Sequence, residues 1–290
     1  MSECGRPVFD GWKLLAGVRR ERPLIHCITN YVTANDTANM LLAMGAFPIM
    51  AEAVQEAKEI TALSQALVLN LGTLNETKAE AMRLSGKMAA SLGRPVILDP
   101  VGAGASRFRT DTARQLIKEI PCTVIRANAS EIRALSGLET DTRGVDAGPK
   151  DRAGSRDMKA AADLLKKLSR DTGAVIVMTG ATDLVADEGK VFRLHNGHPM
   201  MAQITGTGCM MNGILAAFLA AGSAGRLLSG ADSRLWRTVY AVAAAGICGE
   251  YAFERTAMQE GGSGSFRVHY IDAMSCLTDD DIAGGMKLEF

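Results

Sequence analysis

The chain has 290 residues, of which 47% are hydrophobic and only 5% aromatic, and this length suits one large α/β domain or two small ones. The 32 basic and 32 acidic side chains balance, which excludes the basic surplus typical of a nucleic-acid-binding protein. The six cysteines are scattered without a Cys-x-x-Cys pair or zinc-site spacing, so we expect mostly reduced core thiols in a cytoplasmic protein.

No segment of the chain has the pattern of a membrane-targeting or membrane-spanning sequence. The first residues, Met-Ser-Glu-Cys-Gly-Arg-Pro, lack the basic-then-apolar order of a signal peptide. The longest apolar run, at 214–221, is much shorter than a bilayer span. We therefore expect neither a membrane nor a nucleic acid among the partners.

Short apolar segments alternate with amphipathic ones along the first 180 residues. An apolar segment with a polar end occupies 24–31, and the sequence predicts strands at 48–51, 66–71, 96–99, 122–126 and 174–179. It predicts helices at 35–44, 52–65, 75–92, 110–119, 129–136 and 156–170. This alternation predicts an α/β fold with a mainly parallel sheet that helices cover on both faces.

The later part of the chain departs from that alternation. Segments 183–186 and 190–195 flank Asp-Glu-Gly and predict a β-hairpin, which would form an antiparallel edge of the sheet. Polar, glycine-containing segments at 142–157 and 261–265 are typical of loops. Further helices are predicted at 209–222, 232–259 and 268–277. Because no repeat or linker is visible, we expect a single domain over 1–290.

The segment 204–212, Ile-Thr-Gly-Thr-Gly-Cys-Met-Met-Asn, leads from a glycine-rich loop into an apolar helix. The unpaired N–H groups and the positive end of the helix dipole make such a start an anion-binding site. Cys209 lies at this start, where a thiol loses its proton most easily. The alternative is a glycine-rich turn with a small packed cysteine.

Polar side chains also stand where several strands end, the edge at which open parallel sheets bind ligands. Asp99, before a glycine loop, can hold Mg²⁺ beside a phosphate or begin an Asx turn. Arg126 is a natural phosphate partner, and Thr179 could reach a phosphate or end its strand. Asn128 and Glu131 have capping-box spacing, which competes with a catalytic role for Glu131.

The early apolar segment and the predicted strand at 48–51 contain further candidates. Asn30 fits a binding or turn position better than a core position. His26 and Cys27 look like a catalytic pair, but neighbours on a strand point to opposite faces, which favours a structural histidine. Met50 could line an apolar pocket or fill the core.

With these residues in view, the chain resembles the hydroxyethylthiazole kinases of the ribokinase-like group over nearly its whole length, from about residue 23 to 282. The motif around Cys209 is the most specific, because other ribokinase-like kinases usually place aspartate there. The motifs that carry the resemblance lie at 26–32, 48–51, 98–104, 126–131, 196–199 and 205–209.

The resemblance implies ATP- and Mg²⁺-dependent phosphorylation of the hydroxyl of 4-methyl-5-(2-hydroxyethyl)thiazole, a salvage step in thiamine synthesis. It also implies a homotrimer with active sites between subunits. The site residues that it implies are Met50, Gly206 and Asn30 for the thiazole, Arg126, Thr179 and Gly208 for ATP, Asp99 and Glu131 for Mg²⁺, and Cys209 at the reacting hydroxyl.

The chain departs from the family pattern in three places. Ala127 stands where glycine is usual, Met211 and Asn212 replace smaller or more apolar residues, and the loop at 142–157 is longer than typical. These departures bear on the fine geometry of the substrate site and leave the reaction class unchanged.

Two other functions remain open at the level of sequence. A kinase for another small alcohol, such as a hydroxymethylpyrimidine or a sugar, would keep the ATP site and change the pocket. Sugars need several polar partners, which the apolar surroundings of Met50 do not offer. An inactive nucleotide-binding regulatory module is the second alternative, and Asp99, Glu131 and the intact glycine loop argue against it.

Overall fold

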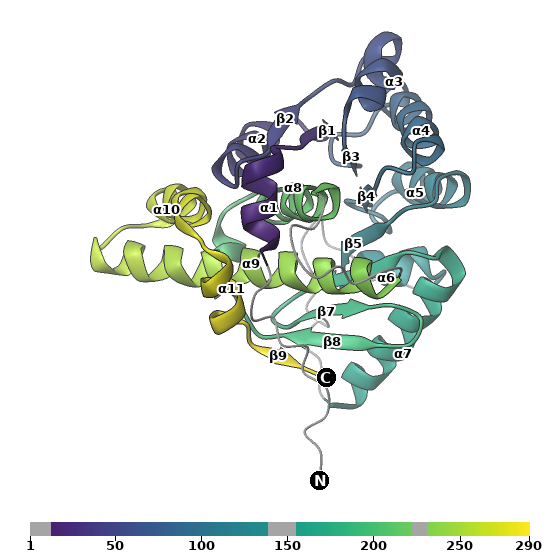
Figure 1. The fold of residues 1–290 in the computed structure, drawn as a ribbon. Coiled ribbons are helices and arrows are strands. Elements are labelled where there is room, and N and C mark those ends of the chain that lie inside the picture. Colours follow the sequence, from purple (N-terminus) through teal and green to yellow (C-terminus); the bar gives the residue numbers. More distant parts are fainter. Residues whose placement is uncertain (1–12, 139–154, 222–230) are drawn as a thin grey trace.

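The computed structural model describes residues 13–138, 155–221 and 231–290, and within them nine strands form one sheet in the order β2-β1-β3-β4-β5-β6-β7-β8-β9 (Figure 1). Pairing is parallel from β2 to β6 and antiparallel from β6 to β9. The predicted parallel sheet with an antiparallel edge is therefore confirmed. The strands are β1 (Leu24–Ile28), β2 (Phe47–Ile49), β3 (Ala66–Asn70), β4 (Val96–Asp99), β5 (Val124–Asn128), β6 (Val175–Thr179), β7 (Asp183–Ala186), β8 (Val191–Leu194) and β9 (Leu288–Glu289).

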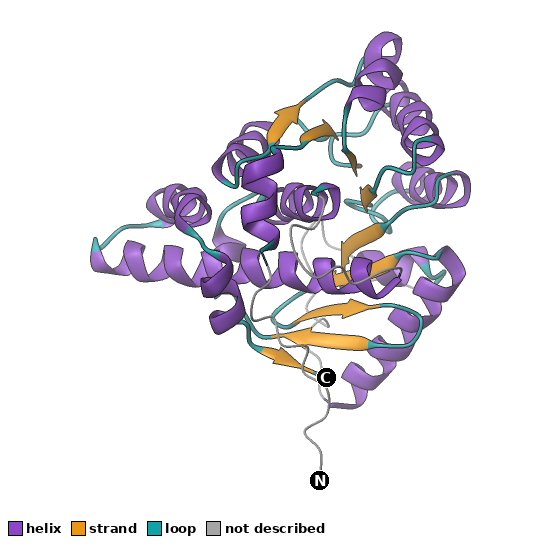
Figure 2. Ribbon diagram, viewed as in Figure 1, coloured by secondary structure: helices purple, strands orange, loops and turns teal. Residues whose placement is uncertain are grey.

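Helices cover both faces of the sheet (Figure 2), and alternate strand residues enter a hydrophobic core on each side, Val68 on one and Leu69 on the other. One layer contains α3 (Val54–Leu63), α4 (Glu76–Ser91), α5 (Arg107–Glu119), α6 (Ala129–Leu135) and α7 (Ser155–Thr172). The other contains α1 (Leu14–Glu21), α2 (Ala34–Ala43), α8 (Thr207–Ala220), α9 (Ala231–Met258), α10 (Ser263–Cys276) and α11 (Asp279–Gly285), with the short 3-10 helix η2 (Pro199–Gln203) packed against α9 and α10.

The order of the strands defines where a ligand crevice opens. From β1 the chain passes through α2 to the edge strand β2, and then returns through α3 to β3 on the other side of β1. Helices α2 and α3 lie on opposite faces, so the chain changes direction between β1 and β3. In open parallel sheets the carboxyl ends of the strands at such a point border the ligand site.

Several elements differ from the sequence prediction. The short elements α1, α11 and β9 were not predicted, and β9 extends the predicted hairpin to a third antiparallel strand. The loop predicted at 261–265 was partly wrong, because α10 begins at Ser263. Burial of Phe266 and Tyr270, one turn apart on α10, outweighs the poor helix propensity of the preceding glycines. Of the loop predicted at 142–157, residues up to 154 lie outside the described ranges, and the rest begins α7.

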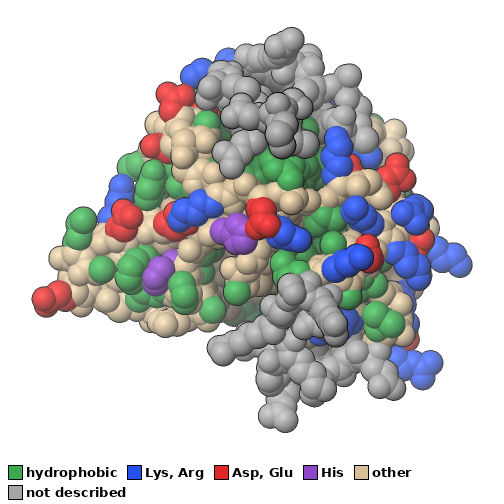
Figure 3. Space-filling model, turned by 90° about the horizontal axis from the view of Figure 1, so that it is seen from below, with side chains coloured by type: hydrophobic (Ala, Val, Ile, Leu, Met, Phe, Trp, Pro, Cys, Tyr) green, Lys and Arg blue, Asp and Glu red, His purple; other side chains and the backbone are tan. Residues whose placement is uncertain are grey.

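The surface drawn in Figure 3 carries acidic and basic side chains interspersed, in keeping with the net charge of zero. Among the described helices, none combines the length and the apolar character that crossing a bilayer requires.

Candidate active site

Helix α8 packs against β1, β3 and β4, and Cys209 in its first turn contacts Asn70, the last residue of β3. The first turn therefore stands at the carboxyl ends of the central strands. Gly206 is its N-cap, with a φ of 94°, and a Cβ there would lie 2.9 Å from Cγ2 of Thr33. Only glycine suits that backbone conformation and that close approach. Cys209 is consequently the third residue of the helix, in the turn whose N–H groups lack intrahelical partners.

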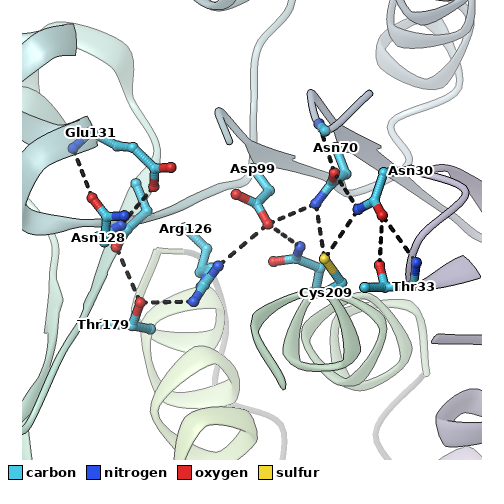
Figure 4. Close-up of polar contacts among 12 residues, drawn as sticks. Asn30, Thr33, Asn70, Asp99, Arg126, Asn128, Glu131, Thr179 and Cys209 are labelled. Carbon is cyan, nitrogen blue, oxygen red and sulfur yellow. Dashed lines mark hydrogen bonds and ion pairs between the residues drawn. The ribbon is translucent and has the colours of Figure 1, made fainter. Parts of the chain in front are cut away.

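Two asparagine amides donate hydrogen bonds to the sulfur of Cys209 (Figure 4). Asn30, just after β1, donates from Nδ2 over 3.3 Å, and Asn70, the last residue of β3, donates over 3.4 Å. The amide of Asn30 is oriented by Thr33, whose N–H and hydroxyl donate to Oδ1, and that of Asn70 by the N–H of Gly72. The sulfur therefore faces two fixed donors at the point where the chain changes direction.

Burial nevertheless raises the pKa of the Cys209 thiol, and the charge of Asp99 adds to the rise. Hydrogen bonds from Thr33 and Asn30 and the charge of Arg126 act in the opposite direction and are outweighed. The start of the helix favours the thiolate, but the sequence left the direction of the net pKa shift open. In the protein without substrates, desolvation penalises the charged form and decides it in favour of the thiol.

Asp99, the last residue of β4, is fully buried and is held by side chains from three other elements. Its Oδ2 accepts from Asn70 over 2.8 Å, from Asn212 over 2.6 Å and from Arg126 over 3.4 Å. Its Oδ1 is buried and has no partner among the described residues. Burial raises the pKa of this carboxyl in spite of the donors. The carboxylate is thus aimed into the site, and not into a local Asx turn.

Arg126 lies against the first turn of α8. A Cβ on Gly208 would be 2.4 Å from Nη1 of Arg126, so only glycine admits the guanidinium here. The other end of the guanidinium, Nη2, donates to the hydroxyl of Thr179, at the end of β6, over 2.8 Å. A helix N-terminus and a guanidinium are both positive, and their convergence makes this point attractive to a multivalent anion such as a phosphate chain.

In Figure 4, Glu131 lies on the side of Arg126 that is away from Cys209. Both of its carboxylate oxygens accept hydrogen bonds from backbone N–H groups. Its Oε2 accepts from the N–H of Asn128 over 2.9 Å, which completes a capping box on α6, and its Oε1 accepts from Gly102 over 2.8 Å. The capping interpretation is confirmed. Burial, together with the charge of Asp99, raises the pKa of Glu131 to about 7.

The described residues contain no group of three or more His, Cys, Asp or Glu side chains that could bind a metal ion. They therefore offer no site that would hold a metal by protein ligands alone. Mg²⁺, however, commonly takes one or two carboxylates and completes its shell with phosphates and water. The unpartnered Oδ1 of Asp99 suits that mode of binding. Glu131, with both oxygens occupied, suits a role through charge or a bridging water.

Met50 and His26 are clarified by their surroundings. Met50 is 38% exposed after the edge strand β2, so it does not fill the core. His26 is fully buried between the carbonyl of Ala51 and the hydroxyl of Thr61 on α3. Cys27 enters the core of the other layer, so the structural interpretation of His26 is confirmed.

Two residues that join the site together were not among the candidates predicted from the sequence. Asn70 bridges Cys209 and Asp99, and Asn212 holds Asp99 from the second turn of α8. With them, polar contacts run without a break from Thr179 to Thr33 in Figure 4. Asn70 could have been found as the polar end of an apolar strand, the criterion that identified Asp99. Asn212 was noted only as a departure from the family pattern.

A cavity of about 700 Å³ lies elsewhere, near the amino ends of β5 and β6. Its lining includes Pro121 and Thr172, which precede β5 and β6, and Lys118 at the end of α5. It is therefore separate from the residues at the carboxyl ends of the strands.

Comparison with known proteins agrees with this geometry. A family model described as "Hydroxyethylthiazole kinase family" matches residues 15–280. The hydroxyethylthiazole kinase of Clostridium acetobutylicum is 46% identical over 275 residues, which cover 95% of this chain and 97% of that protein. The solved structure of a hydroxyethylthiazole kinase protein from Pyrococcus horikoshii OT3 is similar with a TM-score of 0.80 at 33% identity, and the match covers 95% of this chain and 96% of that one. A ribokinase-like superfamily protein from Enterococcus faecalis, 13% identical with a TM-score of 0.56 over 93% and 92% of the two chains, shares the fold.

Proposed function

The chain belongs to the hydroxyethylthiazole kinase family, and we propose that it transfers the γ-phosphoryl group of ATP to the hydroxyl of 4-methyl-5-(2-hydroxyethyl)thiazole. The product is the thiazole phosphate used in thiamine biosynthesis. The observation that carries the proposal is the packing of Arg126 on Gly208 in the first turn of α8, one residue from Cys209. A phosphate site thus adjoins a sulfur that can meet an alcohol.

The nucleotide half of the site, which we assign to Arg126, Thr179 and Gly208, supplies positive charge. Phosphoryl transfer depends on alignment and charge neutralisation more than on covalent chemistry. The Thr179 hydroxyl and Oδ2 of Asp99 hold the guanidinium of Arg126 in place before ATP binds. A preorganised donor has little reorganisation to undergo when charge develops on the phosphoryl oxygens.

The acceptor half, which we assign to Asn30, Met50 and Gly206, holds the thiazole alcohol, with Cys209 at the reacting hydroxyl. As the hydroxyl oxygen forms its bond to the γ-phosphorus, the bond to the β-phosphate oxygen breaks and ADP leaves. The hydroxyl proton passes to Sγ of Cys209 when the sulfur is a thiolate. Because the pKa of this thiol is raised, the thiolate is a minor form at neutral pH, so the base contributes modestly and alignment dominates.

Asp99 and Glu131 are proposed as the residues that organise Mg²⁺, Asp99 through its free Oδ1 and Glu131 by charge or through water. The cation, when bound, neutralises charge on the phosphates. The raised pKa values of the two carboxyls support the proposal, because burial disfavours the negative charge of each group and a bound cation would offset that penalty.

We further propose a single-domain, cytoplasmic homotrimer with a site shared between subunits. Large apolar side chains are exposed next to the acceptor half: Tyr31 is 79% exposed and Val32 60% exposed. Exposed apolar groups gathered at one place are typical of a protein–protein interface. The described cysteines are free, as expected in a reducing compartment.

The test is ADP formation from ATP with a panel of alcohols that includes the hydroxyethylthiazole, a hydroxymethylpyrimidine and simple sugars. We expect turnover with the thiazole alcohol that chelation of Mg²⁺ abolishes. Turnover with a sugar or pyrimidine but none with the thiazole alcohol would refute the substrate. ATP binding without turnover on any alcohol would indicate a regulatory module.

A further inference from the structure

A lysine is buried at the same edge of the sheet, in a place that disfavours a cation. Lys78 is the third residue of α4, in the first turn after the N-cap Asn75. Its side chain is buried, with 2% exposed. Burial penalises its charge, and so does the positive end of the helix dipole. Such a placement requires compensating contacts.

Those contacts join two loops that border the acceptor half. The Nζ of Lys78 donates to the carbonyl of Thr29 over 2.8 Å and pairs with Oε2 of Glu52 over 2.8 Å. Thr29 immediately precedes Asn30, and Glu52 is two residues after Met50. One ammonium, carried by the loop and helix that follow β3, thus links the segments that follow β1 and β2.

We infer that the Lys78–Glu52 bridge is a positioning element that sets the spacing between Asn30 and Met50 and thereby the fit of the acceptor alcohol. The inference rests on the proposed function, which places the acceptor at these residues. Neither Lys78 nor Glu52 is assigned a contact with the substrate. Within the described residues, the nucleotide half does not contact this bridge and is anchored by the hydrogen bonds of Arg126 to Asp99 and Thr179.

The exposure of the two partners separates this role from a purely structural one. The Glu52 side chain is 54% exposed, and glutamine at this position keeps an oxygen that can accept a hydrogen bond from the buried ammonium of Lys78. Glu52→Gln should therefore leave folding intact. If it nevertheless weakens use of the acceptor, the bridge acts on the geometry of the site.

The experiment measures kcat and the KM values for both substrates in Lys78→Met, Glu52→Gln and the double variant, with melting temperatures. Lys78→Met keeps the apolar stem and removes the charge. We expect its KM for the thiazole alcohol to rise by about ten-fold or more, with the KM for ATP little changed, because small displacements of a positioned group are costly. Glu52→Gln should shift the same KM by less, and the double variant should be no worse than Lys78→Met alone.

Lys87→Met is the matched control. Lys87 lies on the same helix, and its Nζ pairs with Oε2 of Glu119 at a distance of 2.6 Å, in a part of the molecule away from the site. Its KM values should equal those of the wild type. The inference is wrong if Glu52→Gln and a folded Lys78→Met keep the wild-type acceptor KM, or if both KM values rise together. If Lys78→Met does not fold, Glu52→Gln decides. A wild type that uses a different alcohol refutes the proposed substrate alone, and the same comparison is then made with that alcohol.

Discussion

At the scale of single residues, the environment of Cys209 shows opposing influences on one thiol. Two amides and the start of a helix favour negative charge on the sulfur, whereas burial and the nearby Asp99 disfavour it and prevail. The protein without substrates therefore holds mainly the thiol, which can take part in a hydrogen bond with the alcohol, and only the minor thiolate form can accept the proton. This balance determines how much turnover each substitution of Cys209 should lose.

We expect Cys209→Ala to bind ATP normally and to lose turnover by a factor near the lower end of the ~10²–10⁴ range for general-base assistance. Cys209→Asp should match or exceed the alanine variant, because a carboxylate can take the same proton. Single-turnover rates and melting curves test the order. Full activity in the alanine variant, with an aspartate variant that is badly destabilised, would reduce Cys209 to a packing residue.

Glu131→Gln should lower turnover, and the structure adds a cost in stability that the sequence did not suggest. Both carboxylate oxygens accept backbone N–H groups, from Asn128 and Gly102, and the amide of glutamine can replace only one acceptor. We expect a loss of about 1–3 kcal/mol in the free energy of unfolding. Urea titrations and steady-state assays measure the two effects, and unchanged turnover in the destabilised variant would leave Glu131 with the capping role alone.

At the scale of secondary structure, the buried side chain of His26 links β1 to α3 and to the segment that follows β2. The ring contacts the carbonyl of Ala51 over 2.7 Å and the hydroxyl of Thr61 over 2.9 Å. Burial lowers the pKa of His26 below its usual 6.5, so the folded protein favours the neutral ring. Its contribution to stability is full above pH 6.5 and is lost as pH falls through the lower, folded pKa, because the unfolded chain then binds the additional proton.

Wild-type protein should therefore lose more unfolding free energy between pH 7.5 and 5.5 than His26→Gln, which can still donate to the Ala51 carbonyl but does not titrate. Urea unfolding at the two pH values gives the comparison. Equal losses in the two proteins would show that other groups account for the acid sensitivity.

At the scale of the whole molecule, apolar side chains border the acceptor half without cover from the described residues of the same chain. Tyr31 and Val32, at the turn that leads into α2, are the most exposed of them. A partner subunit at this edge would bury them and complete the wall of a small apolar pocket. Assembly and activity should then depend on the same surface.

Light scattering at working concentration should show three subunits, and Tyr31→Arg combined with Val32→Asp should dissociate them and reduce activity without unfolding the chain. Leu63→Ser is the control, since Leu63 is 67% exposed at the other end of α3, away from the strand ends that carry the site. A wild-type monomer with full activity would disprove the shared site.

Local patterns in the sequence were sufficient to predict much of this protein. The periodicity of apolar residues predicted the parallel strands and the helices around them. The predicted strand ends marked Asp99, Arg126 and Thr179, although β5 continues to Asn128 and Arg126 therefore lies within it. These signals are readable because backbone conformation, burial on one face and helix capping depend on residues within a few turns of each other. The glycines before Cys209 predicted the anion site for the same reason.

Tertiary structure alone decided how these residues are connected. Cys209 meets Asn30 and Asn70, which are 179 and 139 residues away in the chain, and this pairing depends on the strand order around β1. The sign of the pKa shift at Cys209 follows from burial by several elements at once. The Lys78–Glu52 bridge likewise joins loops that only the folded sheet places side by side. Such contacts carry no local signature, because desolvation and side-chain hydrogen bonding depend on neighbours in space and not on neighbours in the sequence.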